Sequence, residues 1–349
     1  MERTLLAPGY EISRVIRGGW QLAGGHGAVD RHAAVDDLMA TAEAGITTFD
    51  CADIYTGVEE LIGAFRAAYG ARHGADALAG IRVHTKFVPD LEVLPTISKA
   101  YVEKVIDTSL TRLRIERLDL VQFHWWDYAQ PGFLETAGWL DELRRAGKIE
   151  RISGTNFDAA HIEAIASAGI PVTSVQVQYS LLDDRPARRM SEAAARLGFK
   201  LLCYGTVAGG FLSDRWLGQS EPADPLENRS LTKYKLIIDD AGGWAWFQSL
   251  LAALRKVADR HDSDIATVAS RAVLGFDHVA GVIVGARNRA HLDANLAVGA
   301  LRLDEADREI LAPVLALRRS LDGEVYELER DRAGRHGAIM KYNLNAEPA

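Results

Sequence analysis

Residues 45–60 read GITTFDCADIYTGVEE and combine a turn, a strand and a polar loop within one short stretch. Gly45 follows a segment with helical periodicity, and the apolar and β-branched residues after it predict a strand over 46–50. That strand ends at Asp50, and Tyr55 lies in the loop beyond it. A helix, a glycine turn and a buried strand that exits into a polar loop form the repeating unit of an α/β fold.

The same helix-to-strand turn is expected at Gly147, Gly169 and Gly198, where a glycine separates a helical segment from an apolar run. Glycine adopts the left-handed conformation beyond a helix end at little cost. Strands are expected over 14–20, 46–50, 82–87, 118–123, 150–155, 173–178, 199–204 and 281–285. Eight strands alternating with helices predict an α/β fold of the (β/α)8 (TIM) barrel type. The segment TLLAPGYEI before them predicts an N-terminal β-hairpin that turns at Pro8-Gly9.

A doubly wound α/β sheet is the rival fold. It would normally bind a dinucleotide through G-x-G-x-x-G at the first helix, and the nearest match, GGHGAVD at 24–30, has the wrong spacing. The barrel is favoured, as a single domain over 1–349 with its core at about 14–312. Residues 213–246 are expected to form a long loop at the C-terminal mouth. The C-terminal extension, 318–349, is expected to pack over the barrel or a neighbouring subunit, or to be an ordered tail without substrate contact.

Composition limits the partners. The chain has 349 residues, 48% of them hydrophobic, and a net charge of -8, which argues against nucleic acid and anionic membranes as partners. Cys51 and Cys203 lie in strand-like stretches, as expected for buried free thiols in a reducing compartment. The N-terminus has no apolar signal region, and no apolar run approaches about 18 residues. These features predict a cytoplasmic protein without a membrane partner; a monomer and a homo-oligomer both remain open.

Two later strands also end in groups that can exchange a proton. Lys86 lies near the end of the segment VHTKF, and His124 follows DLVQF. Because the C-terminal ends of barrel strands converge on one mouth, Asp50, Tyr55, Lys86 and His124 form a candidate catalytic site. The remaining histidines have no metal-ligand spacing and no Cys/His cluster exists, so no metal is expected.

In order and in flanking sequence, these four residues resemble the Asp-Tyr-Lys-His tetrad of the aldo-keto reductases. The stretch from Gly45 resembles that family's signature G-x-x-x-F-D-x-A-x-x-Y-G-x-x-E, with Thr56 inserted before Gly57. The resemblance continues through ISGTNFD, VQVQYSLL, LLCYGTVAGGFL and VIVGARNRAHLDANL, over roughly residues 10 to 300. It implies a barrel enzyme that transfers a hydride between a nicotinamide dinucleotide and a carbonyl compound.

The resemblance also implies a division of roles. Tyr55 would be the general acid, and the ammonium of Lys86, held by Asp50, would lower the pKa of the phenol. His124 would hydrogen-bond the carbonyl oxygen. The hydride has to come from a cofactor, because no side chain donates one.

Cofactor residues are carried over from the resemblance in three groups. The carboxamide is assigned to Thr155, Asn156 and Gln176, and the nicotinamide ring to Tyr204. The pyrophosphate is assigned to the segment Gly205–Leu212, which includes Thr206, Val207 and Gly209. The adenosine end is assigned to Gly285, Ala286, Arg287, His291 and Asn295. A guanidinium suits a 2'-phosphate, so Arg287 makes NADP the expected cofactor, with NAD as the alternative.

Substrate identity is less constrained. Trp20, Trp125 and Trp126 are expected at the mouth, and the long loop carries Trp216, Trp244 and Trp246. An aromatic wall suits an aldehyde and also the apolar face of a sugar. Three functions therefore stay open: an NAD(P)H-dependent reductase of aldehydes or ketones, an NAD(P)-dependent sugar or alcohol dehydrogenase, and a nucleotide-binding regulatory subunit that senses redox state.

Overall fold

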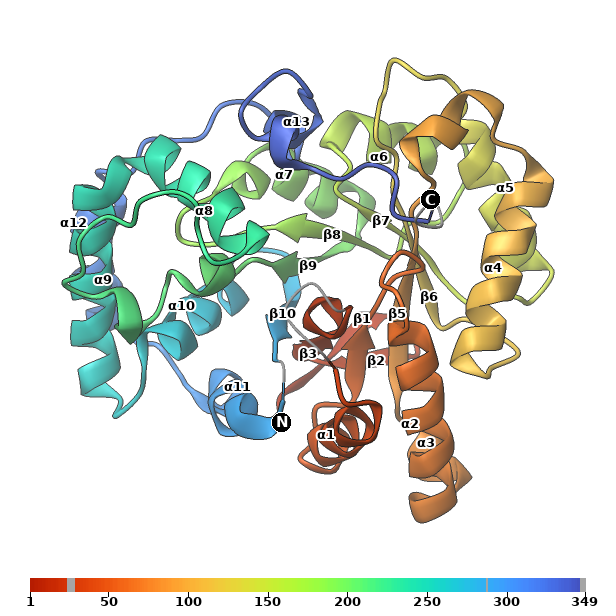
Figure 1. Cartoon of the computed structure of the whole chain (residues 1–349), viewed down its shortest axis with the longest axis horizontal. Coiled ribbons are helices and arrows are strands. Elements are labelled where there is room, and N and C mark those ends of the chain that lie inside the picture. The colour runs from red at the N-terminus through yellow and green to blue at the C-terminus, as the bar shows by residue number, and fades with distance from the viewer. Residues whose placement is uncertain (24–28, 287, 346–349) are drawn as a thin grey trace.

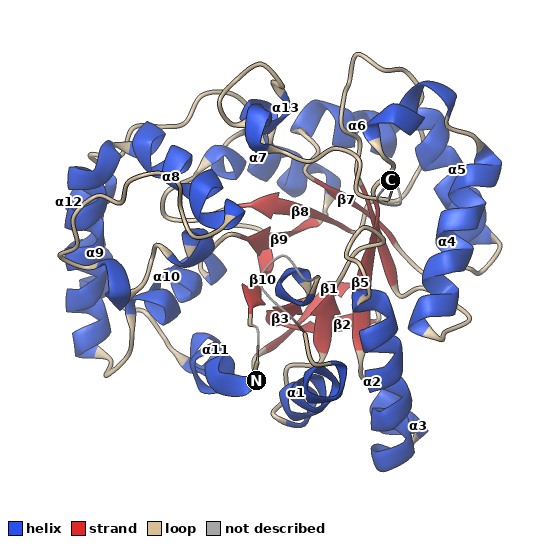
Figure 2. Cartoon of the chain, viewed as in Figure 1, coloured by secondary structure: helices blue, strands red, loops and turns tan. Residues whose placement is uncertain are grey.

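The computed structural model describes residues 1–23, 29–286 and 288–345. Eight parallel strands close into a barrel in the order β10-β3-β4-β5-β6-β7-β8-β9. Their bounds are β3 Val15–Gly18, β4 Thr48–Asp50, β5 Arg82–Phe87, β6 Leu120–Phe123, β7 Ile152–Thr155, β8 Ser174–Gln178, β9 Lys200–Tyr204 and β10 Val279–Gly285. The strands lie at the centre of the molecule and helices surround them (Figure 2). The predicted (β/α)8 barrel is confirmed.

The helices cover the outside of the barrel (Figure 1). Their bounds are α1 Arg31–Glu43, α2 Val58–His73, α3 Ala75–Ala79, α4 Lys99–Leu113, α5 Phe133–Arg145, α6 Ala159–Ser167, α7 Arg189–Leu197, α8 Arg229–Ala241, α9 Gly243–Arg260, α10 Ile265–Leu274, α11 Leu292–Ala300, α12 Glu305–Leu315 and α13 Glu327–Arg330. The four expected helix-to-strand glycines, Gly45, Gly147, Gly169 and Gly198, have φ angles of 98°, 86°, 82° and 79°. Their positive φ confirms the turns from which the repeat was inferred.

The predicted hairpin closes the N-terminal end of the barrel. Strands β1 Arg3–Ala7 and β2 Tyr10–Ser13 are antiparallel, and Gly9 has a φ of 73° at their turn. Tyr10 and Ile12 are fully buried and pack with the barrel residues Ile16, Leu120, Leu202 and Ala280. The opposite end, at the C-terminal ends of the strands, is therefore the end that carries the candidate site.

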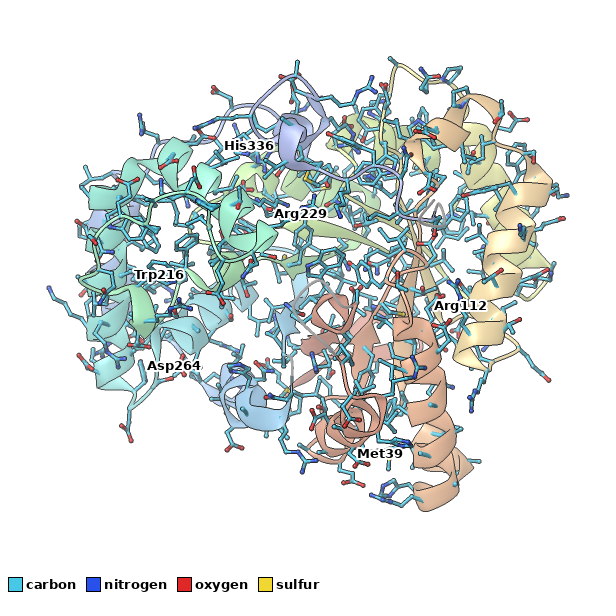
Figure 3. The ribbon with its side chains drawn as sticks, in the orientation of Figure 1. Met39, Arg112, Trp216, Arg229, Asp264 and His336 are labelled. Carbon is cyan, nitrogen blue, oxygen red and sulfur yellow. The ribbon has the colours of Figure 1, made fainter. Side chains whose placement is uncertain are left out.

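Residues 213–246 are not the long loop that was expected. The segment contains α8 and the start of α9, because Leu231, Tyr234, Ile238 and Ala241 recur at helical spacing and are buried on one face. Trp216, Trp244 and Trp246 do not line the mouth: they belong to a second hydrophobic cluster with Phe211 and Phe247. Trp216 lies beside the helices α8 to α10 (Figure 3).

The C-terminal segment packs over the barrel, which was one of the expected alternatives. We call residues 318–345 the C-terminal strap. The strap carries α13 and runs across the end of the molecule near β7 and β8 (Figure 1). It is attached at both ends, because Arg318 donates to the backbone oxygen of Leu181 and the backbone N–H of Leu344 donates to Asp90. Both cysteines are buried and free, and no described helix is long and apolar enough to cross a membrane.

Candidate active site

A buried ion pair lies at the centre of the site. Lys86 on β5 donates to the Oδ2 of Asp50 at 2.6 Å and to the backbone oxygen of Cys51 at 2.8 Å. Both side chains are about 95% buried. Burial alone would lower the pKa of Lys86, but Asp50 and Tyr55 outweigh it and the pKa lies above its ordinary value. Lys86 is therefore a charged ammonium at neutral pH.

Tyr55 lies directly over this ammonium. The Nζ of Lys86 is 5.2 Å from the centroid of the phenol ring. The resemblance led us to expect a lowered pKa for the phenol, and Lys86 does act in that direction. Burial outweighs it, however, and raises the pKa of Tyr55 above its ordinary value. The phenol is therefore protonated at neutral pH, as a proton donor has to be.

Polar side chains from two more strands fix the Asp50 carboxylate. Gln122 on β6 and Gln176 on β8 donate from Nε2 to the Oδ1 of Asp50 at 2.8 and 2.7 Å. Gln176 also donates to the Oε1 of Gln122 at 2.8 Å. Gln122 was missed by the sequence reasoning, although it stands two residues before His124 and so shares its inward face. Both donors of Gln176 are used here, which leaves its Oε1 as the atom able to accept from a carboxamide.

His124 is neutral and lies at the exit of the neighbouring strand β6. Its Nδ1 is 3.0 Å from the backbone oxygen of Thr155, and because a carbonyl oxygen can only accept, Nδ1 carries the proton. Burial, reinforced by the charge of Arg330, lowers the pKa of His124 to about 3. Its Nε2 is buried and has no hydrogen-bond partner among the described residues. In this state Nε2 is an acceptor, so it can receive a hydroxyl proton but cannot donate to a carbonyl oxygen.

The residues assigned to the nicotinamide end gather at the exits of β7 and β9. The Tyr204 hydroxyl donates to the Oδ1 of Asn156 at 2.8 Å, and Asn156 has a positive φ of 60°. Thr155 is buried at the end of β7 beside it. An aromatic ring next to amide groups is the donor and acceptor set that a nicotinamide needs, so these residues fit that group.

The segment assigned to the pyrophosphate is covered by α8. A Cβ on Gly205 would lie 2.2 Å from the hydroxyl of Tyr234, and one on Gly209 would lie 2.8 Å from the same ring. Thr206 shares a hydrogen bond of 2.9 Å with Ser270 on α10. Val207 precedes Gly209 in the same turn. Tyr234 packing therefore already accounts for both glycines, independently of any ligand.

The residues assigned to the adenosine end follow β10. Gly285 ends that strand and Ala286 follows it, His291 is exposed, and Asn295 is buried on α11. Arg287, the residue expected to bind a 2'-phosphate, lies outside the residues that the structure describes.

Two of the three expected substrate tryptophans lie at the site and one does not. The ring of Trp20 is 5.1 Å from that of Tyr55, and the ring of Trp126 is 4.3 Å from that of His124. Trp125 is fully buried, and its Nε1 donates to the backbone oxygens of Asp127 and Gln130. Trp125 is therefore a core residue rather than a wall of the mouth.

Comparison with known proteins identifies the family of this chain. The sequence model of the aldo/keto reductase family matches residues 14–315. The chain belongs to this family. It is 30% identical to flagellar radial spoke protein 5 of Chlamydomonas reinhardtii over 63% of this chain, a match that spans only 48% of that protein. It is 24% identical to the NADH-specific methylglyoxal reductase of Escherichia coli, over 86% of this chain and 94% of that protein.

Solved structures support the fold of this aldo/keto reductase family member. A glycerol dehydrogenase from Gluconobacter oxydans superimposes with a TM-score of 0.72 at 22% identity, over 90% of this chain and 94% of the other. At that identity the likeness concerns the barrel alone.

Beyond the expected tetrad, the C-terminal strap contributes side chains to the site. The ring of Tyr326 lies 5.7 Å from that of His124, and Tyr326 is 4% exposed with a φ of 62°. Arg330 donates to the backbone oxygens of Trp125 at 3.0 Å and Asn156 at 2.7 Å. A left-handed tyrosine costs about 1–2 kcal/mol, so the surrounding contacts have to hold it in place.

A buried ion cluster anchors the strap. Arg185 binds Asp183 at 2.8 Å and Glu329 at 3.0 Å, and all three side chains are at most 2% exposed. Burial would raise the pKa of Glu329, but Arg185 and Lys233 lower it to about 2. No local sequence pattern indicates this cluster, because Arg185 and Glu329 are 144 residues apart.

Proposed function

We propose that the protein is an NAD(P)H-dependent oxidoreductase that reduces an aldehyde or ketone to an alcohol, with Tyr55 as the general acid. The observation that carries the proposal is the buried Lys86–Asp50 pair beneath a protonated phenol. A fixed ammonium stabilises the phenolate that remains after the proton has left.

The residues of the chain have separable tasks in this mechanism. Tyr55 donates its proton to the carbonyl oxygen as negative charge develops there. Asp50 keeps Lys86 charged and oriented, and Gln122 and Gln176 hold Asp50 in place. The cofactor, when bound, supplies the hydride. Closing the mouth with Tyr326 and the indoles of Trp20 and Trp126 would exclude water from the reacting atoms.

For the cofactor we propose NADPH, with NADH as the alternative. Thr155, Asn156 and the Oε1 of Gln176 would hold the carboxamide, and the ring of Tyr204 would stack on the nicotinamide. The segment with Gly205, Thr206, Val207 and Gly209 would lie along the pyrophosphate. Gly285, Ala286, Arg287, His291 and Asn295 would surround the adenosine. The choice depends on Arg287, and the E. coli relative is named as NADH-specific. We further propose that the chain acts as one domain in the cytoplasm, since buried free cysteines suit a reducing compartment.

A second candidate is oxidation of a sugar or alcohol by the same site. The state of His124 favours it, because the free Nε2 of a neutral ring accepts a hydrogen bond from a hydroxyl group. To assist a carbonyl oxygen, the ring would first need a second proton. A third candidate, a regulatory subunit, would bind the dinucleotide without turnover.

The central experiment compares Tyr55→Phe with the wild type. Reduction of 4-nitrobenzaldehyde should fall at least about a hundredfold, since a general acid contributes that much. Dinucleotide affinity, followed by quenching of tryptophan fluorescence, should stay nearly unchanged. Tyr69→Phe is the matched control, because it deletes a hydroxyl from a ring that packs on α2 against Phe65. Retained activity in Tyr55→Phe would show that the assigned acid is wrong.

Steady-state rates in both directions separate the remaining candidates. Faster oxidation of an alcohol or sugar with NAD(P) than reduction of any aldehyde would replace the leading proposal by the second. Tight dinucleotide binding without turnover in either direction would point to the third. Comparing NADPH with NADH in the same titrations decides the cofactor.

A further inference from the structure

Cationic side chains surround Tyr326 at the mouth. The Nζ of Lys233 on α8 lies 5.4 Å from the centroid of its ring, and the guanidinium of Arg330 also lies at 5.4 Å. Arg229 stands one helical turn before Lys233, on the same face of α8. Arg229 is exposed, and its guanidinium donates to the backbone oxygen of Ile339 on the strap. Since Tyr326 also contacts His124, these charges border the place where a carbonyl compound would react.

The negative charges nearby do not balance these cations. Glu329 is 3.9 Å from Lys233, but it is shared with Arg185, which also holds Asp183. Among the residues described, Arg229 and Arg330 have no carboxylate within 4.0 Å and donate to backbone oxygens instead. The group thus contains four cations and two carboxylates. An excess of two positive charges stands at the mouth of a chain whose net charge is -8.

Lys233 faces the reacting end rather than the segment assigned to the pyrophosphate. Contact with Gly205 and Gly209 is made by Tyr234, which is uncharged. Lys233 instead lies 5.3 Å from the ring of Tyr204 and has no hydrogen bond to a described residue. Lys235, on the other side of the helix, is fully paired with Glu221 and Asp239. Unlike Lys235, the ammonium of Lys233 therefore has N–H donors that can bind a ligand.

We propose that the substrate carries a carboxylate, which Lys233 and Arg229 bind while its carbonyl group lies between Tyr55 and His124. The inference rests on the proposed function of the tetrad and adds the substrate class to it. The side chain of Lys233 is 15% exposed, and a largely buried ammonium gains much from an anion because burial removes the water that would otherwise solvate it. Burial accordingly lowers the pKa of Lys233, and a bound carboxylate would raise it again. The ring of Tyr326 would border the apolar part of such a substrate, beside the nicotinamide that Tyr204 would hold.

The test compares two aldehydes of the same shape, 4-formylbenzoate and its methyl ester. For the wild type, kcat/KM should be about 10- to 100-fold higher with the acid, the usual range for hydrogen bonds to charged groups. Lys233→Met combined with Arg229→Gln should abolish this preference, so that the acid and the ester give kcat/KM values within a few-fold of each other. Lys235→Met, which removes one positive charge from the other side of α8, should keep the preference.

A binding measurement separates failure of this inference from failure of the proposed function. Quenching of tryptophan fluorescence by 4-(hydroxymethyl)benzoate should be salt-dependent in the wild type and should weaken at least tenfold in the double variant. If the wild type reduces the ester and the acid equally well, the carboxylate inference is overturned, but the turnover itself still supports the proposed reductase. Weakened NADPH binding in the double variant, with the acid preference intact, would also overturn it and assign the two cations to the cofactor. Charge-dependent binding of the acid without turnover of either aldehyde would uphold the carboxylate site and sink the reductase.

Discussion

Replacing Glu329 with glutamine tests whether the ion cluster holds the C-terminal strap in place. The substitution keeps the size of the side chain and removes one of the two carboxylates that face Arg185. The pKa of Glu329 is lowered from 4.5 to about 2. A difference of about 2.5 pKa units corresponds to about 3 kcal/mol of stability at neutral pH. Loss of one partner from a buried ion pair costs a similar amount, about 3–5 kcal/mol.

The pH dependence has a definite sign. Because the pKa of Glu329 is depressed in the folded state, its contribution is fully present above the unfolded value of 4.5. It is lost as the pH falls through 4.5 toward 2. The difference in stability between wild type and Glu329→Gln should therefore be about 3 kcal/mol at pH 7 and should shrink steadily below pH 4.5.

Urea unfolding at a series of pH values measures this difference, and hydrogen exchange of peptides from the strap locates it. Exchange protection of residues 318–345 should fall about a hundredfold in the variant if the strap opens before the barrel. Glu305→Gln is the matched control: its exposed pair with Arg308 on α12 should change stability by no more than about 0.5 kcal/mol. A loss below about 1 kcal/mol at pH 7, or a loss that persists unchanged at pH 3, would refute the reasoning.

Three further predictions concern the barrel mouth. Gln122→Leu removes a hydrogen-bond donor from the Asp50 carboxylate and should lower kcat about tenfold without changing the Kd of the dinucleotide. Stopped-flow kinetics would measure kcat, and fluorescence titration would measure Kd. A tenfold loss of dinucleotide affinity alongside the loss of kcat would indicate a general packing defect instead. Gly205→Ala should destabilise the fold by more than 2 kcal/mol in urea unfolding, because its φ is 76° and its Cβ would clash with Tyr234; Tyr234→Phe in the same chain should recover part of that loss. In ¹H–¹⁵N NMR, His124 should stay neutral from pH 8 to pH 5, because its pKa is lowered to about 3, and a titration near pH 6.5 would contradict the assigned burial.

The barrel was predictable from the sequence because its signals are local. Each helix-to-strand glycine, such as Gly45, marks a turn that depends on its neighbours alone. Buried parallel strands are short apolar runs, and their C-terminal ends have to meet at one mouth whatever the helices do. Asp50 and Lys86 could therefore be paired in advance, and the structure places them 2.6 Å apart.

The walls of the mouth could not be predicted, because they depend on contacts between distant segments. Nothing near Glu329 in the sequence indicates that Arg185 will neutralise it. Prolines and glycines in 213–246 obscured α8, although four apolar residues at helical spacing were present in it. The predicted lowering of the pKa of Tyr55 was wrong because it considered only the charge of Lys86. The burial that raises this pKa depends on distant segments and could not be inferred from the sequence.

Arg330 connects the strap to the chemistry through charge as well as through packing. Its guanidinium ties together the loops after β6 and β7 by binding the backbone oxygens of Trp125 and Asn156. The same charge helps to keep His124 neutral. An anionic group bound beside Tyr326 would offset part of this charge and so raise the pKa of His124, while burial, the larger cause, would continue to lower it. A carboxylate on the substrate would then do more than increase affinity, because it would also act on the pKa of His124.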